Sequence, residues 1–426
     1  MASYESYKDS GVKWLGQIPS HWEIVPGKAI FDEDKTKNTN NSETFVLSLS
    51  YGNIIPKRDI NEGLVPENYS GYQIVEPGYI IIRCTDLQND KVSLRTGHVN
   101  HHGIISGAYL GLKPKNGINS RFLHYLLHNW DVSKELYRYG SGLRQSLSWS
   151  DIKYLLLTMP PIQEQKAIVA YLDKVTGEID CAIEAQQKMI EALNERKQII
   201  ITRAVTRGIN PDAPLRDSGI DWLGKIPAHW EIVRTSFVFP KIGSGTTPSS
   251  RNEAYYSDNG IPWLQTGDLN DGILRQTSKC ISPKAMKEVK LRIYPKYSIV
   301  IAMYGATIGK TSIVDFDTTV NQACCVLPAN SKCDSEFAMF YFQSTKNVLI
   351  QSANGGGQPN INQQLIRRHK MVLPPQDEQK GIVNYIKLKT IPLDKSIANC
   401  ERMISLLQER KQIIINEVVT GKKKVI

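Results

Sequence analysis

A segment that the chain contains twice constrains its fold more than any other feature. Residues 160–172 recur as residues 374–386, with Pro-Pro at the start and Glu-Gln-Lys at the same place in both copies. Further along, residues 195–201 recur as residues 409–415 without a single change. Both pairs are 214 positions apart (374 − 160 and 409 − 195), so no insertion or deletion interrupts the repeat. Such a duplication predicts two similar halves related by a pseudo-twofold axis.

Each copy is expected to be mostly helical. The prolines end the preceding segment, and Glu164 or Asp377 places negative charge at the helix N-terminus. Apolar residues then recur at spacings of three and four, which is typical of a helix with one apolar face. Because Pro392 interrupts helical hydrogen bonding, we predict a short helix, a break near residues 176–177 or 390–391, and a long helix of about 28 residues, roughly 42 Å in length. The narrow apolar stripe favours a coiled-coil seam.

A second repeated segment opens each half of the chain. Residues 9–25 and 217–233 are identical at 13 of 17 positions and share the pattern Asp-Ser-Gly-x-x-Trp-Leu-Gly-x-Ile-Pro-x-His-Trp. Between these openings and the helices the halves differ, and short β-branched runs separated by Gly, Pro and Asn predict mixed, mostly β domains. Strands are expected at 45–49, 79–82, 108–112, 297–302, 311–314 and 324–327, and helices at 120–130 and 334–343.

The predicted fold class is therefore α+β. Two mixed, mostly β domains are separated by two long helices, and these helices form an antiparallel coiled coil in a pseudo-twofold tandem repeat. The boundaries that we predict are 1–155 and 215–370 for the two domains, and 156–214 and 371–426 for the helical spacers.

Composition narrows the class of protein. The net charge of +10 and the pI of about 9.0 are compatible with nucleic-acid binding, although charge alone does not decide it. No apolar run approaches the 18 or so residues of a membrane span, and the N-terminus has no signal-peptide pattern. Seven cysteines without a Cys-x-x-Cys pair favour reduced thiols. We expect a cytoplasmic protein that does not contact membranes.

The duplicated Pro-Pro-x-x-Glu-Gln helices, the repeated opening and the two divergent domains resemble the specificity subunit of a type I restriction-modification system. The resemblance covers essentially the whole chain. It implies that each divergent domain is a target recognition domain that reads one half of a bipartite sequence in double-stranded DNA. It also implies that the helices space these domains and bind two methyltransferase subunits, through which restriction subunits join.

The same resemblance implies that the chain has no catalysis and no cofactor of its own, with S-adenosylmethionine, ATP and magnesium belonging to the partner subunits. The alternative is a free-standing DNA-binding or scaffold protein without enzymatic partners. Candidate partner-binding residues lie in the repeated helical segment: Glu195, Arg196, Lys197, Glu409, Arg410 and Lys411.

Motifs that resemble catalytic sites do not support an enzyme. Residues 305–311 resemble a phosphate-binding P-loop but have only three residues between the glycines, where a P-loop has four. Neither Pro-Pro pair is preceded by the Asn or Asp of an adenine methyltransferase, since Met159 and Leu373 stand there. His98, His101 and His102 have no Cys or acidic partner at ligand spacing, so we expect no metal site.

Glycine-rich loops carry the candidate DNA contacts. Residues 140–146 and 354–360 align at the same offset of 214 and differ in side chains that could meet base edges. The second domain adds two further loops with hydroxyl and amide groups. The alternative for each loop is that it is an ordinary turn without a DNA contact. The candidates are Arg144 and Gln145 in the first domain, and Ser244, Thr246, Gln265, Thr266, Lys310, Gln358 and Asn360 in the second.

Overall fold

The structure is a computed structural model, and it describes residues 3–57, 68–85, 87, 94–138, 146–353 and 360–425. The chain divides into two compact units. Unit 1 comprises Met1–Gln187 and Glu401–Ile426, and unit 2 comprises Lys188–Cys400. Two long helices, α4 (Ile162–Arg207) and α10 (Gln376–Val419), each contribute one part to each unit.

Both long helices are continuous, so the predicted breaks near residues 176–177 and 390–391 are wrong. Helix α4 has 46 residues and α10 has 44, and Pro392 lies inside α10. Proline removes the donor that would bond the carbonyl oxygen of Leu388, four residues earlier. Leu388 is 70% exposed and Pro392 is also exposed. Water can therefore bond this carbonyl group, and the helix continues past the proline.

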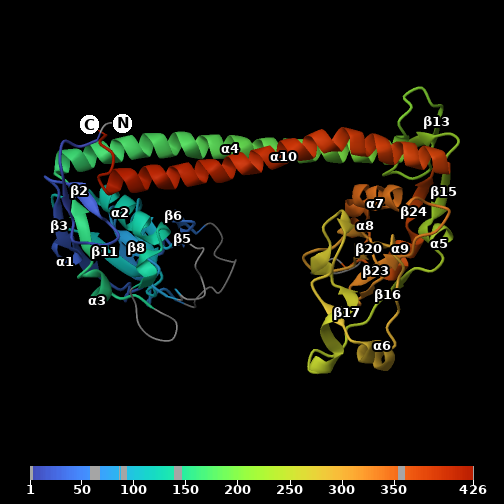
Figure 1. The fold of residues 1–426 in the computed structure, drawn as a ribbon, viewed down its shortest axis with the longest axis horizontal. Helices are drawn as coiled ribbons and strands as arrows, with labels where there is room; N and C mark the ends of the chain where they lie inside the picture. Colours follow the sequence, from blue (N-terminus) through green and yellow to red (C-terminus); the bar gives the residue numbers. More distant parts are fainter. Residues whose placement is uncertain are drawn as a thin grey trace. The chain divides into compact units, whose positions relative to one another are not determined.

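The two helices pack antiparallel in each unit (Figure 1). In unit 1, Lys411 of α10 forms an ion pair of 2.7 Å with Asp180 of α4. In unit 2, Lys197 of α4 forms an ion pair of 2.6 Å with Asp394 of α10. The two lysines are 214 positions apart, as are the two aspartates, so the repeat forms the same contact twice. The predicted antiparallel pair is confirmed.

Unit 1 surrounds a four-stranded antiparallel sheet with the strand order β4-β11-β8-β9. Helix α2 packs on this sheet, and its Phe122, Leu126 and Trp130 share one buried cluster with Ile80 and Leu112 of the strands. The elements are β1 (Tyr7–Asp9), β2 (Gln17–Pro19), β3 (Glu23–Pro26), α1 (Gly27–Ile30), β4 (Phe31–Asp34), β5 (Leu47–Ser50), β6 (Asn53–Pro56), β7 (Gln73–Val75), β8 (Ile80–Ile82), β9 (Thr96–His98), β10 (Gly103–Ile105), β11 (Leu110–Pro114), α2 (Ser120–Val132), η1 (Glu135–Arg138), α3 (Trp149–Ile152) and β12 (Leu156–Met159).

Unit 2 has a different central sheet of five strands, in the order β16-β23-β20-β21-β18, beside a smaller sheet β19-β17-β22. Helix α7 packs on the larger sheet through Phe337 and Tyr341. The elements are β13 (Leu215–Asp217), β14 (Lys225–Pro227), β15 (Glu231–Arg234), α5 (Thr235–Val238), β16 (Gly243–Ser244), η2 (Glu253–Tyr255), β17 (Tyr256–Leu264), η3 (Thr266–Asp268), β18 (Ile273–Leu274), β19 (Cys280–Ile281), α6 (Pro283–Val289), β20 (Ile299–Ala302), β21 (Thr311–Val314), β22 (Thr319–Val320), β23 (Cys324–Leu327), α7 (Ser335–Ser344), α8 (Lys346–Gln351), α9 (Gln363–Arg368) and β24 (Lys370–Leu373).

The predicted α+β class is confirmed in both units. The expected helices correspond to α2 and α7, and the six expected strands overlap β5, β8, β11, β20, β21 and β23. None of the helices that the structure describes has the length and apolar character needed to cross a membrane.

Candidate nucleic-acid interface and its scaffold

The two repeated segments contact each other, which explains why they recur together. In unit 1, His21 of the opening segment lies 2.8 Å from Glu164 at the start of α4. In unit 2, His229 lies 2.8 Å from Glu378 at the start of α10. Tyr4 also donates a hydrogen bond to Glu164. The histidine of each opening and the glutamate of the helix that follows it therefore form one joint.

The glutamine beside each of these glutamates fastens the long helix to the domain before it. Gln165 accepts a hydrogen bond of 2.9 Å from the backbone of Asn119, and Gln379 accepts one of 2.8 Å from the backbone of Asp334. The Asn119 and Asp334 side chains cap α2 and α7 by accepting from the first backbone N–H groups of these helices. One residue type at one repeat position thus orients the helix that covers each sheet.

Each opening segment also receives the end of a long helix. After α10, Gly421 has a φ of 75°, and a side chain there would place its Cβ 2.3 Å from Pro19 of unit 1. After α4, Gly208 also has a φ of 75°, and its Cβ would lie 3.2 Å from Trp230 of unit 2. A left-handed glycine is the usual end of a helix. Each unit therefore joins the start of one long helix to the end of the other.

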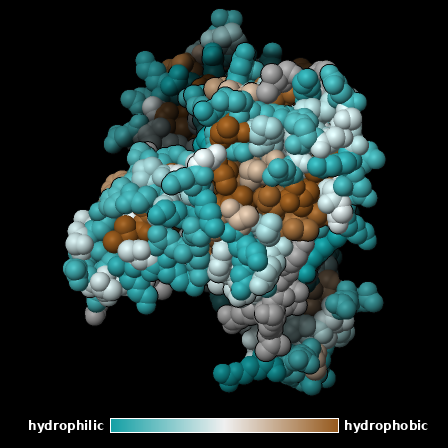
Figure 2. All heavy atoms as spheres, turned by 90° about the vertical axis from the view of Figure 1, so that its left-hand side faces the viewer, coloured by the Kyte–Doolittle hydropathy of each residue, from teal (hydrophilic) through white to brown (hydrophobic). Residues whose placement is uncertain are grey.

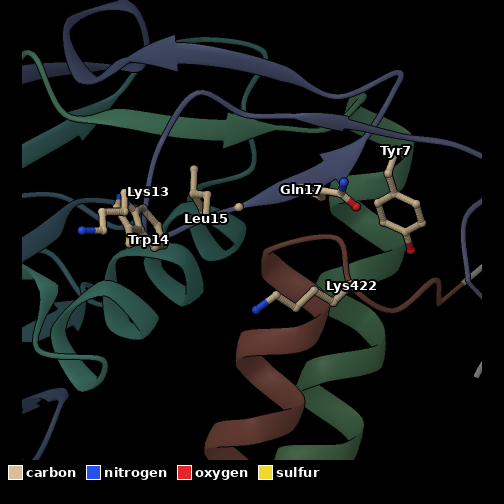
Figure 3. Close-up of a pocket in the computed structure, with 7 residues that line it drawn as sticks. Tyr7, Lys13, Trp14, Leu15, Gln17 and Lys422 are labelled. Atoms are coloured by element: carbon tan, nitrogen blue, oxygen red, sulfur yellow. The ribbon is translucent and has the colours of Figure 1, made fainter.

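A surface hollow of about 460 Å³ marks this joint in unit 1 (Figure 3). Lys13, Trp14 and Gln17 line it from the opening segment, Tyr7 lines it from the start of β1, and Lys422 reaches it from the segment after α10. The two lysines add positive charge at the repeated scaffold rather than at the divergent part of the unit.

Two candidate loops of unit 2 lie side by side. Ser244 ends β16, and Thr246 follows with an exposed side chain. Trp263 Nε1 donates a hydrogen bond of 3.3 Å to the carbonyl oxygen of Thr246, which ties this loop to the end of β17. Gln265 and Thr266 come directly after β17, and both are partly exposed. The structure therefore brings these four candidates into one surface region.

Lys310 joins the same region. Its ammonium group donates a hydrogen bond of 3.4 Å to the carbonyl oxygen of Leu269, just after the loop that holds Gln265. Residues 303–310 form the connection between β20 and β21, with Gly305 and Gly309 at positive φ. The segment that resembles a P-loop is thus the connection of a hairpin between β20 and β21.

Asn360 reaches this connection from another part of the chain. Its side chain is exposed, and the next residue, Ile361, donates a hydrogen bond of 2.8 Å to the carbonyl oxygen of Met303. Arg144, Gln145 and Gln358 lie outside the described residues, so these three candidates stay predictions.

The sequence did not single out a hollow of about 590 Å³ in unit 1. Lys35, Lys37, Asn68 and Tyr72 line it, so it combines positive charge with amide and hydroxyl groups. Such groups suit contacts with phosphate and sugar. The Lys-Thr-Lys run of residues 35–37 is the sequence feature that could have indicated this hollow, but a short basic run is also common on surfaces without a binding site.

The three histidines considered for a metal have separate partners. His98 contacts Ser120 and Asn100, His102 contacts Glu43 and Glu76, and His101 packs edge-on against Phe45. Within the described ranges, no cluster of three or more His, Cys, Asp or Glu side chains could hold a metal ion.

The six candidate partner-binding residues divide into two kinds. Lys197 and Lys411 form the ion pairs inside the helix pair. The other four side chains, Glu195, Arg196, Glu409 and Arg410, are exposed. Of the six candidates, these four face away from the helix pair and can meet a partner.

Comparison with known proteins identifies the family. A family described as the type I restriction modification DNA specificity domain matches residues 19–192 and again residues 227–397. The chain belongs to this family. The two matched ranges each include a divergent domain and part of a long helix, in agreement with the repeat.

One relative in this family covers nearly the whole chain, and another covers about half of it. The chain is 26% identical to the putative type I restriction enzyme MjaX specificity subunit of Methanocaldococcus jannaschii, and the match covers 98% of both proteins. It is 24% identical to the type I restriction enzyme EcoKI specificity subunit of Escherichia coli, over 47% of this chain and 44% of that protein. These relatives confirm the predicted resemblance to specificity subunits of type I restriction enzymes.

A solved structure has the same fold. Its description reads "Structural basis underlying complex assembly and conformational transition of the type I R-M system", and it is 17% identical to this chain with a TM-score of 0.68. The match covers 94% of this chain and 98% of that one.

Proposed function

We propose that the chain is the DNA sequence-specificity subunit of a type I restriction-modification complex. Each divergent domain reads one half of a bipartite target in double-stranded DNA, and the long helices space the two domains and bind two methyltransferase subunits. Restriction subunits join through these. The chain supplies recognition and assembly, and its partners supply catalysis.

One observation carries this proposal: the two units repeat the same scaffold contacts, but their central sheets differ. The His–Glu joint, the glutamine bridge and the lysine–aspartate pair recur in both units with closely matching distances. By contrast, unit 1 has a four-stranded central sheet and unit 2 a five-stranded one. A constant scaffold with two different domains suits a protein that reads two different sequences at one assembly.

Two equivalent hollows, one in each unit, support the proposal that the chain binds two methyltransferase subunits. In unit 1, Asn129 and Val132 of α2 line a hollow of about 260 Å³ with Gln412 and Ile413 of α10. In unit 2, helices α7 and α8 line a hollow of about 470 Å³ with Gln198 and Ile199 of α4, the residues 214 positions earlier. Ile413 is 48% exposed and Ile199 is 59% exposed. Repeated apolar side chains at the surface suit two copies of one protein partner.

The end face of unit 1 also gathers apolar side chains among hydrophilic ones (Figure 2). Exposed apolar patches of this kind are typical of protein–protein contact. This surface supports a chain that works inside an assembly rather than a free-standing DNA-binding protein.

Reconstitution tests the division of labour. The purified chain, incubated with S-adenosylmethionine and DNA, should transfer no methyl group until the methyltransferase subunits are added. Sequencing of the DNA with methylation detection should then reveal a bipartite motif. Transfer by the chain alone would refute the non-catalytic role, and failure to form a complex with the methyltransferase subunits would favour the free-standing alternative.

Exchange of one domain tests the two-part reading. We predict that replacing residues 234–370 with the corresponding part of a related subunit changes one half of the methylated motif and leaves the other half intact. The matched exchange of residues 26–155 should change the opposite half. A change in both halves after either exchange would contradict independent recognition.

A further inference from the structure

The β5–β6 hairpin of unit 1 presents an aromatic side chain in an unusual backbone conformation. Tyr51 and Gly52 form its two-residue turn, with φ angles of 45° and 78°. A turn of this kind requires positive φ at both central residues, and Asn-Gly is the sequence that adopts it most readily. A bulky residue with positive φ is a genuine outlier. Yet Tyr51 stands there and is 89% exposed, so packing inside the chain does not explain it.

The base of the hairpin is firmly held. Leu47 and Ile54 belong to a buried cluster, and the hairpin lies directly on Gly97 of β9. A Cβ at Gly97 would lie 2.7 Å from Leu49 and 2.8 Å from Ile54, so the side chains of the hairpin pack closely against the backbone of β9. The hairpin therefore holds Tyr51 on a rigid support, which is what precise recognition requires.

The outer face of the hairpin is polar near its tip and carries no negative charge. Ser48 and Ser50 alternate with the leucines of β5, and Asn53 is exposed on β6 opposite Ser50. Asn53 Nδ2 donates a hydrogen bond of 3.2 Å to the carbonyl oxygen of Tyr51 at the tip. There is no acidic residue from position 44 to position 57, and Lys57 follows the hairpin. Hydroxyl and amide groups on a strand pair that has no acidic side chain of its own can approach DNA closely.

The dimensions of the hairpin fit a DNA groove. Paired strands lie about 4.8 Å apart, and four residues of strand extend about 13 Å. The major groove is about 12 Å wide and about 8.5 Å deep, and it admits a two-stranded ribbon. The tip and the outer face could then meet base edges while the base of the hairpin stays outside the groove.

Unit 2 follows a different path at the corresponding place. Strand β4 of unit 1 and strand β16 of unit 2 both form an edge of the central sheet, but β16 is followed by η2 and the long strand β17, which pairs with β19 and β22 instead of forming a two-residue hairpin. The hairpin thus belongs to the divergent part of unit 1, where residues that distinguish one half-site from the other are expected.

We infer that the β5–β6 hairpin is a specificity-determining element of unit 1, which enters the major groove of double-stranded DNA with Tyr51 at its tip and Ser50 and Asn53 beside it. This inference rests on the proposed function. Tyr51 contacts a base or its sugar, and the polar pair reads neighbouring base edges in one half-site only.

Substitution of Tyr51 tests the inference in the complex with the methyltransferase subunits. Tyr51→Asn places a residue that favours positive φ at the turn, so thermal unfolding should show a stability equal to or above that of the wild type. Affinity for a duplex with the mapped methylation motif should fall on the order of tenfold to a hundredfold. Discrimination against a scrambled half-site should be lost for the half assigned to unit 1 by the domain exchange, and kept for the other half.

Tyr297 supplies a matched control. It is also a tyrosine with positive φ, 65°, and it is 50% exposed, but its carbonyl oxygen accepts a hydrogen bond from Ser335 at the start of α7. Tyr297 lies just before β20, at the opposite end of that strand from the 303–310 connection that holds Lys310, so Tyr297→Asn should leave DNA affinity unchanged. Tyr51→Phe separates the ring from its hydroxyl group: retained affinity assigns the DNA contact to the ring, and reduced affinity assigns it to the hydroxyl group.

Three results would overturn the inference. Wild-type affinity and discrimination in Tyr51→Asn would remove the hairpin from the DNA interface. If Tyr51→Asn assembled less well with the methyltransferase subunits, but the complex that still forms bound DNA like the wild type, the hairpin would be a contact with a partner protein and not with DNA. A wild-type complex without any sequence preference would refute the proposed function itself, and the hairpin's role with it.

Discussion

At the scale of single residues, His128 of α2 shows that the two units have chemically different side chains at equivalent positions. Its Nδ1 atom is enclosed and has no hydrogen-bond partner among the residues that the structure describes. Burial lowers the pKa of its imidazole to about 4, with Lys411 and Lys134 contributing repulsion. Counted from the capping residue of each helix, the equivalent position of α7 holds Gln343 (128 − 119 = 343 − 334). Its side-chain amide donates a hydrogen bond of 2.8 Å to the carbonyl oxygen of Asp271 and cannot titrate. Unit 1 therefore carries a titratable group where unit 2 has a neutral one.

This difference predicts an acid sensitivity of unit 1. The folded pKa of His128, about 4, lies below the unfolded value of about 6.5, so the unfolded chain binds more protons between these values. Its contribution is fully present above about pH 6.5 and is lost as the pH falls toward 4. Between pH 7 and pH 5, the free energy of unfolding should fall by up to about 2 kcal/mol more in the wild type than in His128→Gln.

Urea unfolding at the two pH values measures this difference. Asp131 acts in the opposite direction, because burial raises the pKa of its carboxyl group to about 6, and the folded state then binds the extra proton between pH 3.8 and 6. Asp131 is present in both proteins, so its effect cancels in the comparison. Equal pH dependence in the wild type and the variant would show that His128 is already satisfied in the folded state.

At the scale of single elements, α10 tolerates a proline that its repeat partner does not have. Pro392 corresponds to Glu178 of α4 (392 − 214), and both helices are continuous at this position. Proline in a helix interior is about 3 kcal/mol less favourable than alanine. Because Pro392 and Leu388 are exposed, part of this cost is already offset by water.

Replacing each residue by its counterpart in the other helix should therefore change the free energy of unfolding in opposite directions. Pro392→Glu restores the missing donor, and we expect the free energy of unfolding to rise by about 1–2 kcal/mol. Glu178→Pro, the matched variant in α4, should lower it by a similar amount or more. If Pro392→Glu were destabilising in urea unfolding, a bend at this proline would be needed for the packing of α10.

The elements also show which parts of the fold can be predicted from sequence. Helices α2 and α7 and strands β21 and β23 were predicted closely, because local apolar patterns determine them. The continuous long helices were missed, since the exposure of a proline depends on tertiary packing and cannot be read from its sequence neighbours. The joint between His21 and Glu164 links residues 143 positions apart, so the repeat revealed both motifs but not their contact.

The candidate site, like the fold, could be predicted from the sequence only in part. Residue chemistry selected the loops of Ser244 and Gln265, but only the bond from Trp263 to Thr246 shows that they share one region. Tyr51 was missed because an exposed aromatic residue carries no sequence signal. Its positive φ becomes visible only once the hairpin register is known.

At the scale of the whole molecule, the two lysine–aspartate pairs mark equal lengths on both long helices. The interval from Asp180 to Lys197 on α4 (197 − 180 = 17) equals the interval from Asp394 to Lys411 on α10 (411 − 394 = 17). This interval corresponds to about 26 Å of helix. Since both helices carry the same interval, we propose that the length of helix between the pairs sets the spacer between the two DNA half-sites.

Paired insertion of one heptad tests this proposal. One heptad added after Gln187 in α4 and another after Glu401 in α10 keep the apolar stripe and both ion pairs, and lengthen each helix by about 10 Å. At about 3.4 Å per base pair, the distance between methylated positions should grow by about three base pairs while both half-site sequences stay the same. Insertion in α4 alone, the matched control, shifts one helix against the other and should disrupt an ion pair and weaken assembly. A fully active paired variant with an unchanged spacer would show that the partner subunits, rather than these helices, determine the distance.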